Sequence, residues 1–283
     1  MSADPSGAIR LAKLLAKRGV ASRRKAEQLI VDGCVAVNGE LVTHPATMVH
    51  PVNDRVNVNG VALPKAQDDA YYLFYKPKGC ITTRTDPHGR KTVFDLLGKI
   101  PEVVQPIGRL DFDTEGALLL TNDGALAHAL THPSRKVPKR YLAKVYRTPS
   151  EKTLKLIESG KVFLEDGPVH NAKVRVVDTT DKTNAWVEIT VTEGRNRLIR
   201  RLFQQVGHPV AKLRRESFGT ISIRGLERGQ ARRLTADEVR RLRDLSQGIK
   251  PKKAGRVKRK AGFAVPRKKM RRTGRGQRKP KRG

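Results

Sequence analysis

The chain has 283 residues, of which 59 are Lys or Arg and 27 are Asp or Glu, so its formal net charge is +32 at pH 7. This length allows one or two domains with packed cores, and so positive a chain favours a polyanionic partner, nucleic acid before an anionic membrane surface. No stretch approaches the roughly 18 apolar residues of a membrane span, and the start lacks the apolar core of a signal peptide. The two cysteines, Cys34 and Cys80, form no CxxC pair, so we expect a cytoplasmic protein without disulfides or a zinc site.

Cofactor motifs are absent from the sequence. There is no GxxxxGK[ST], no GxGxxG between a strand and a helix, and no HExxH, and the seven histidines are scattered. These motifs mark sites for nucleotides, dinucleotides and zinc. If the chain is an enzyme, we expect it to need no cofactor and no metal.

A small domain is predicted for residues 9–67, after eight N-terminal residues (1–8) that are expected to be disordered. Residues 10–18, RLAKLLAKR, place three leucines on one helical face, and Ser22 can cap a second helix that ends at Gly33. Two Asn-Gly pairs, at 38–39 and 59–60, lie between short apolar runs. Such pairs predict tight β-hairpins, so the domain is expected to combine two helices with two hairpins.

Three cations, Arg23, Arg24 and Lys25, occupy the first turn of the second predicted helix. Exposed cations at this end oppose the helix dipole and cost roughly 0.3–1 kcal/mol each. The free N–H groups of a helix N-terminus bind phosphate, so cations placed there suit a phosphate site. A basic turn that is merely tolerated is the alternative interpretation.

A larger domain is predicted for residues 69–247, after a short linker at 64–70. YYLFYKP (71–77), ALLL (117–120), RYLAKVYR (140–147) and WVEITVTEG (186–194) read as strands. ALAHALTH and residues 195–207 read as helices, and Thr235 with Glu238 predicts a capping box for a last helix. Strands and helices mix without strict βαβ repetition, which favours an α+β fold.

Residues 248–283 contribute 17 of the Lys and Arg residues and no acid. A segment so rich in charge, Gly and Pro cannot bury a core, so we expect a disordered basic tail. About half of the excess positive charge therefore lies outside the tail, in the two predicted domains.

The stretch GRLDFDTEGALLLTNDG, residues 108–124, places Asp111, Asp113 and Glu115 at alternate positions before an apolar run. The spacing matches the start of a calcium-binding EF-hand loop, but the twelfth position is Asn122 and cannot give a bidentate carboxylate. A glycosidase-like carboxylate pair is a second alternative, although neighbours on one strand face could not flank a sugar. A solvated acidic turn before a buried strand is the third.

Several motifs in order resemble those of known families. RLAKLLAKRGVASRRKAEQLIVDGCVAVNG resembles the S-four-type RNA-binding domain, and the larger domain resembles the small-subunit-type branch of the pseudouridine synthases. The second resemblance depends on YKPKGCITTRTDPHGRKTVFDLL, GRLDFDTEG, HPSRKVPKRYLAKV, EGRNRLIRRLFQQVG and LRRESFG. It implies an α+β architecture: a small helix-rich RNA-binding domain, then a catalytic domain with a mixed, mainly antiparallel sheet flanked by helices.

The resemblance also implies roles for single residues. Asp111, the Asp of GRLD, corresponds to the catalytic carboxylate, and Asp113 and Glu115 fall at variable positions, on the surface or behind the site. Arg200 corresponds to a basic partner that keeps the Asp ionised, and Tyr141 to an aromatic ring that stacks on the target base. Three more residues are implied to bind substrate, namely Arg109, Leu213 and Arg215, while Arg23, Arg24 and Lys25 would contact RNA.

The implied function is the isomerisation of a specific uridine in ribosomal RNA to pseudouridine. Within the branch, DPHGRKTVFDLL, HPSR and EGRN are most similar to enzymes of large-subunit rRNA. The reaction is mass-neutral, which agrees with the missing cofactor motifs, and the expected partner is rRNA or a pre-ribosomal particle, bound by a monomer. The alternatives are a non-catalytic ribosome-assembly factor and a synthase acting on small-subunit rRNA.

Overall fold

We describe residues 7–98, 100–181 and 183–249 from a computed structural model of the chain. The disorder expected for residues 1–8 and for the basic tail 248–283 falls almost wholly outside these ranges. No helix in the described part of the chain is long and apolar enough to cross a membrane.

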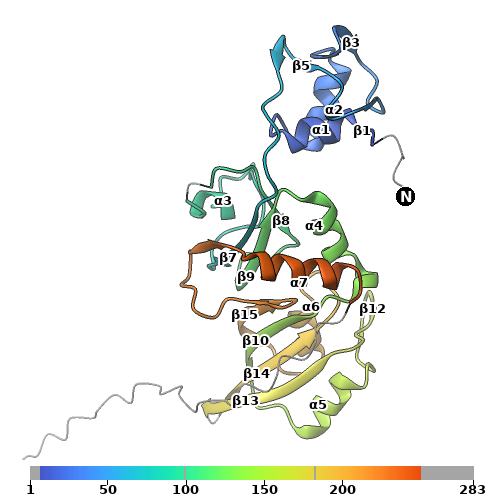
Figure 1. Ribbon diagram of the computed structural model, residues 1–283. Helices are drawn as coiled ribbons and strands as arrows, with labels where there is room; N and C mark the ends of the chain where they lie inside the picture. The colour runs from blue at the N-terminus through green and yellow to red at the C-terminus, as the bar shows by residue number, and fades with distance from the viewer. Residues whose placement is uncertain (1–6, 99, 182, 250–283) are drawn as a thin grey trace, which may run out of the picture. The chain divides into compact units, whose positions relative to one another are not determined.

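The N-terminal region contains two short helices and small antiparallel sheets (Figure 1). Helix α1 (Leu11–Lys17) packs against α2 (Arg23–Val31), whose N-cap Ser22 accepts a hydrogen bond from the Lys25 N–H as predicted. One two-stranded sheet pairs β1 (Ile9–Arg10) with β4 (Met48–Val49). The other sheet has the order β3-β2-β5-β6, with bounds Glu40–Val42, Val35–Val37, Val56–Val58 and Val61–Ala62.

Both predicted hairpins are present in this region. Asn38 and Gly39 connect β2 to β3, and Asn59 and Gly60 connect β5 to β6, all four with positive φ. Positive φ at both central positions is the geometry of the type I′ turn that Asn-Gly favours. The apolar faces of the helices and hairpins meet in one core that includes Leu11, Leu15 and Ile30.

The larger region is built on one mixed sheet. Its main strands have the order β13-β14-β10-β15-β9-β7-β17, while β16 pairs with β15 and β8 with β9. Among these pairs only β15 with β9 is parallel, as the α+β prediction of a mainly antiparallel mixed sheet requires. The strand bounds are Tyr71–Lys76 (β7), Gln105–Ile107 (β8), Thr114–Thr121 (β9), Lys139–Tyr146 (β10), Lys173–Asp181 (β13), Asn184–Val191 (β14), Val210–Phe218 (β15), Ile221–Ser222 (β16) and Ala231–Arg233 (β17).

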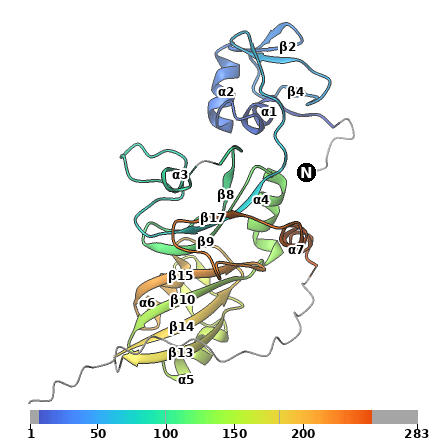
Figure 2. The ribbon, with the colours of Figure 1, turned by 60° about the vertical axis from the view of Figure 1, so that its left-hand side comes forward.

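Helices cover the sheet in two groups. Figure 2 shows β13, β14, β10 and β15 side by side, and their core includes α5 (Glu151–Glu158) and α6 (Leu198–Gln205). Helices α4 (Gly124–Thr131) and α7 (Ala236–Ser246) contact each other and pack on β7 and β9 (Figure 1). The remaining elements are α3 (Val93–Leu96), the 3-10 helix η1 (Pro133–Arg135) and the small hairpin of β11 (Phe163–Leu164) and β12 (Gly167–Pro168).

Strand β9 is buried along its whole length because both of its faces are covered. Ala117 and Leu119 pack into the core with α4 and α7, whereas Leu118 and Leu120 pack into a second core with α3. A strand covered on both faces reads as a continuous apolar run. This explains the ALLL stretch. The GRLDFDTEG segment leads directly into this central strand.

One predicted helix is shorter than its apolar pattern suggests. The pattern predicts a helix over residues 195–207, but α6 begins at Leu198, after Arg197 in a left-handed conformation with φ 46°. Its apolar face is buried as expected, at Leu198, Ile199, Leu202 and Phe203. The three preceding residues form a loop held by side-chain contacts that periodicity does not reveal.

Candidate active site

A cavity of about 380 Å³ lies in the larger domain, where β9, β10, β15 and the start of α6 meet. Its volume is within the range of pockets that enclose small organic ligands. The cavity brings together five of the six site residues that the sequence predicted in this domain, namely Arg109, Asp111, Tyr141, Leu213 and Arg215. The sixth, Arg200, is not among the lining residues.

Asp111 begins a tight turn that is fixed at every carbonyl. The Thr114 N–H donates to the Asp111 carbonyl over 3.1 Å and closes the turn. The Gly79 N–H donates to the Phe112 carbonyl over 2.9 Å, and Arg200 donates to the Asp113 carbonyl over 3.3 Å. The half-buried Asp111 side chain therefore projects into the cavity from a backbone with few alternative conformations.

Lys76 donates hydrogen bonds to the same turn, a role that the sequence analysis did not predict. Its side chain is fully buried at the end of β7, and its Nζ donates to the carbonyls of Asp111 and Thr114, each over 3.0 Å, and to that of Pro77 over 3.1 Å. Burial lowers the pKa of Lys76, and the charges of Cys80, Asp111 and Asp113 oppose that effect. A lysine that ends an otherwise apolar strand, YYLFYK, was the available signal.

Arg200 is bound to Asp113 and not to Asp111. One guanidinium nitrogen lies 2.9 Å from the Asp113 carboxylate, and the other donates to the Val210 carbonyl over 3.2 Å. Burial lowers the pKa of Arg200, and the carboxylates of Asp113 and, less strongly, Asp111 oppose the lowering. The pair anticipated between Arg200 and Asp111 is thus replaced by an ion pair with Asp113, two residues further along the turn, while the charge of Asp111 still acts on Arg200.

The two other carboxylates of the motif lie outside the cavity lining. A guanidinium nitrogen of Arg197 also lies 3.7 Å from the Asp113 carboxylate. Glu115 is mostly buried and pairs with Arg228 at 3.1 Å. Both carboxylates form ion pairs with arginines, which is typical of a structural role. No group of three or more His, Cys, Asp or Glu residues in the described ranges could hold a metal ion.

Tyr141 and Leu213 form an apolar wall of the cavity. Tyr141 lies on β10 directly opposite Arg215 of β15, next to a β-bulge between Arg140 and Tyr141. Bulges re-aim side chains next to active sites. An aromatic ring and a leucine beside a carboxylate suit a flat, partly apolar ligand such as a nucleobase.

Two buried cations also line the cavity. Arg215 is 2% exposed, and its Nε donates to the Ala117 carbonyl over 2.7 Å, while one of its other nitrogens is buried without a partner. Lys139 is 8% exposed and donates to the carbonyls of Val137 and Thr192. Burial, reinforced by the charge of Arg215, lowers the pKa of Lys139 to about 8. These groups offer donors to carbonyl or phosphate oxygens of a ligand.

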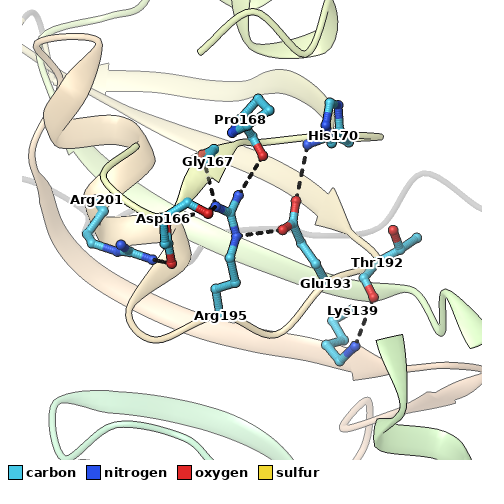
Figure 3. A network of polar contacts seen from close by, with 9 residues as sticks. All are labelled: Lys139, Asp166, Gly167, Pro168, His170, Thr192, Glu193, Arg195 and Arg201. Carbon is cyan, nitrogen blue, oxygen red and sulfur yellow. Dashed lines mark hydrogen bonds and ion pairs between the residues drawn. The ribbon is translucent and has the colours of Figure 1, made fainter. Parts of the chain in front are cut away.

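A polar network fixes the loop before α6, which forms one side of the cavity (Figure 3). Arg195 binds Glu193 over 2.7 Å and Asp166 over 2.8 Å, and it also donates to the carbonyls of Gly167 and Pro168. Arg201 binds the other Asp166 oxygen over 2.7 Å. Arg195 therefore supports the loop by holding it to the β11–β12 hairpin, a role that the EGRN motif did not disclose.

The cations predicted to contact RNA in the N-terminal region, Arg23, Arg24 and Lys25, lie together in the first turn of α2. All three are exposed. Their side chains are thus accessible to a phosphate backbone, and none of the three is among the residues that line the cavity.

Comparisons with known proteins identify two regions. The family of RNA pseudouridylate synthases matches residues 70–205, and the S4 domain family matches residues 9–56. Ribosomal large subunit pseudouridine synthase B of Bacillus subtilis (strain 168) is 45% identical over 238 residues, which are 84% of this chain and 96% of that protein. An uncharacterised RNA pseudouridine synthase of Aquifex aeolicus (strain VF5) is 44% identical over 83% of this chain and 93% of that protein. A crystal structure of a pseudouridylate synthase superposes with a TM-score of 0.59 at 28% identity, covering 83% of this chain and 99% of that one.

Proposed function

This chain belongs to the RNA pseudouridine synthases, which are isomerases, and from that premise we propose that it converts one uridine of large-subunit ribosomal RNA to pseudouridine with Asp111 as the catalytic carboxylate. The choice of rRNA and of subunit is supported by the similarity to the Bacillus subtilis enzyme. The observation that carries the proposal is the convergence of Asp111, Tyr141 and Arg215 on one cavity.

The reaction breaks the bond between N1 of uracil and C1′ of the ribose, turns the base, and joins C5 to C1′. The proton on C5 is lost and a proton is gained at N1, so atoms balance without any imported group. A carboxylate supports both routes open to such a step, because it can attack the sugar as a nucleophile or take a proton from it as a base. Asp111 is the one carboxylate of its turn that lines the cavity.

The other cavity residues are assigned by what they touch. Tyr141 and Leu213 would hold the faces of the uracil while its glycosidic bond is broken. The unpartnered nitrogen of Arg215 would donate to a uracil or phosphate oxygen, since a buried donor without a partner is costly in the free protein. Arg200 would act through the turn, since its ion pair with Asp113 fixes the segment that carries Asp111.

A base must leave its stack to enter a cavity of this size, and unstacking costs a few kcal/mol. Phosphate contacts from exposed cations can offset that cost. We assign this role to the first turn of α2 and to Arg109 at the cavity, and we place the target uridine in or beside a loop, where unpaired bases are accessible. The activity would belong in the cytoplasm, with rRNA or a pre-ribosomal particle as substrate.

The test uses purified full-length protein and rRNA of both subunits that lacks the modification, in EDTA, followed by site-resolved mapping of pseudouridine. We expect a single new pseudouridine in large-subunit rRNA. A product confined to small-subunit rRNA would overturn the subunit assignment alone. No product on naked rRNA or on pre-ribosomal particles, from folded protein, would favour a non-catalytic assembly factor.

A further inference from the structure

Phe112 is an exposed aromatic residue in the middle of the Asp111 turn. It is 50% exposed, and it lies between Asp111, which lines the cavity, and Asp113, which binds Arg200. The Thr114 N–H closes the turn on the Asp111 carbonyl, so Phe112 occupies the first of its two central positions. The phenyl ring is therefore presented to solvent one residue away from the catalytic carboxylate.

The turn fixes the backbone that carries this ring. The Phe112 carbonyl accepts from Gly79, and the carbonyls on either side accept from Lys76 and Arg200. Four hydrogen-bonded carbonyls in a row, from Asp111 to Thr114, restrict the backbone on which the ring stands. A backbone ordered in this way has already lost part of the freedom that binding would otherwise remove.

Scattered exposed apolar residues are common on protein surfaces and need no explanation. The surroundings of Phe112 are what distinguish it. Arg109 is exposed and lines the cavity that Asp111 lines. The side chain of Arg197 is 49% exposed and contacts the Asp113 carboxylate. An exposed aromatic ring on a segment that also carries or binds exposed arginines has the composition of a surface on which single-stranded nucleic acid stacks.

We propose that the Phe112 ring stacks on a nucleobase that flanks the target uridine when that uridine enters the cavity. This inference rests on the function proposed above. Extrusion of the uridine removes a stacking partner from its neighbour in the chain, and the ring beside Asp111 replaces it. A phenyl ring has no hydrogen-bonding groups, so it selects for an unpaired or helix-terminal flanking base without selecting its identity.

Stacking of a base on an aromatic side chain is worth about 1–3 kcal/mol by alanine substitution, which corresponds to about 5- to 150-fold in affinity. We expect Phe112→Ala to lower kcat/KM by at least about fivefold on an RNA stem-loop that contains the mapped uridine. Phe112→Leu, which keeps an apolar side chain, should be as impaired as Phe112→Ala, whereas Phe112→Trp should keep wild-type activity. Phe163→Ala is the matched control, because Phe163 is 66% exposed in the same domain and does not line the cavity.

A second measurement detects the stack itself. The inert variant Asp111→Asn is mixed with stem-loops that carry 2-aminopurine at the nucleotide before or after the uridine, and the fluorescence is recorded at saturating protein. Quenching at one flanking position that disappears in Asp111→Asn/Phe112→Leu supports the proposal. Equal quenching in both proteins, or full activity of Phe112→Leu with an unchanged melting temperature, would overturn it. Wild-type protein that forms no pseudouridine on any rRNA would instead refute the proposed function.

Discussion

Lys139 shows how burial tunes a single residue beside the cavity. Its ammonium group is held by two carbonyls and lies near the charge of Arg215, and its pKa is lowered from 10.5 to about 8. The folded state therefore releases this proton at lower pH than the unfolded state does. Between about pH 8 and about pH 10.5 the unfolded chain binds more protons, so the stability that depends on Lys139 rises with pH in this window.

Lys139→Met should remove this dependence. Each pKa unit corresponds to about 1.36 kcal/mol, so wild type should gain on the order of 3 kcal/mol of unfolding free energy relative to the variant between pH 8 and pH 10.5. The two carbonyls left without a donor add an offset that does not change with pH. Denaturant unfolding at several pH values measures the difference, and parallel stability curves for the two proteins would show that Lys139 titrates normally.

At the scale of elements, the parallel pairing of β9 with β15 joins two strands whose residues line the site. Gly116 has φ 119°, and a Cβ built on it would lie 2.2 Å from the Arg215 carbonyl oxygen and 2.6 Å from the Arg215 nitrogen. Backbone cannot move away as a flexible side chain can. Only glycine allows the two strands to approach so closely, and this approach places Arg215 beside Gly116, in the cavity that Asp111 also lines.

Gly116→Ala should therefore be strongly destabilising. A left-handed conformation alone costs roughly 1–2 kcal/mol for a residue with a Cβ, and the backbone clash adds to it, for a total on the order of 3 kcal/mol or more. Gly225→Ala is the control, because Gly225 also has a positive φ, 81°, but nothing within 4 Å of a built Cβ. Thermal melting compares them, and equal losses in both variants would mean that the strand contact is not the cause.

Local signals predicted the elements well, and long-range contacts set the details that they missed. Asn-Gly pairs produced both hairpins, and the capping box of Thr235 and Glu238 begins α7 as expected. The late start of α6 depends on contacts of Arg195 with a hairpin almost 30 residues away in sequence. Likewise, the partner of Arg200 depends on the turn that carries Asp113, 87 residues earlier. Neither contact leaves a periodic pattern in the sequence.

At the scale of the whole molecule, charge dominates the expected interaction with RNA. The segment 248–283 contributes 17 cations, and the preceding domains are also basic. Cations that neutralise phosphates release counterions, so affinity falls with salt, with a log–log slope proportional to the number of phosphates contacted. A basic tail adds affinity that does not depend on sequence, whereas the cavity and the turn beside it act on one nucleotide.

Removal of the residues after Gln247 should weaken binding to all RNAs and flatten the salt dependence, while kcat at saturating substrate stays close to wild type. Binding measured at several salt concentrations gives the slopes. A tail of equal length with its 17 cations replaced by Gln separates the effect of charge from that of length. Slopes unchanged by truncation would show that the tail contacts no phosphates.

The assignment of Asp111 is tested most directly by tritium release from rRNA labelled at C5 of uridine, because loss of the C5 proton accompanies each turnover. Asp111→Asn should release no tritium above background while it binds the substrate RNA about as tightly as wild type. Asp113→Asn should keep most of the activity, since Asp113 does not line the cavity and Arg200 still donates to its backbone carbonyl. Turnover by Asp111→Asn would contradict the assignment. If Asp113→Asn were then folded but inactive, Asp113 would be the catalytic carboxylate instead.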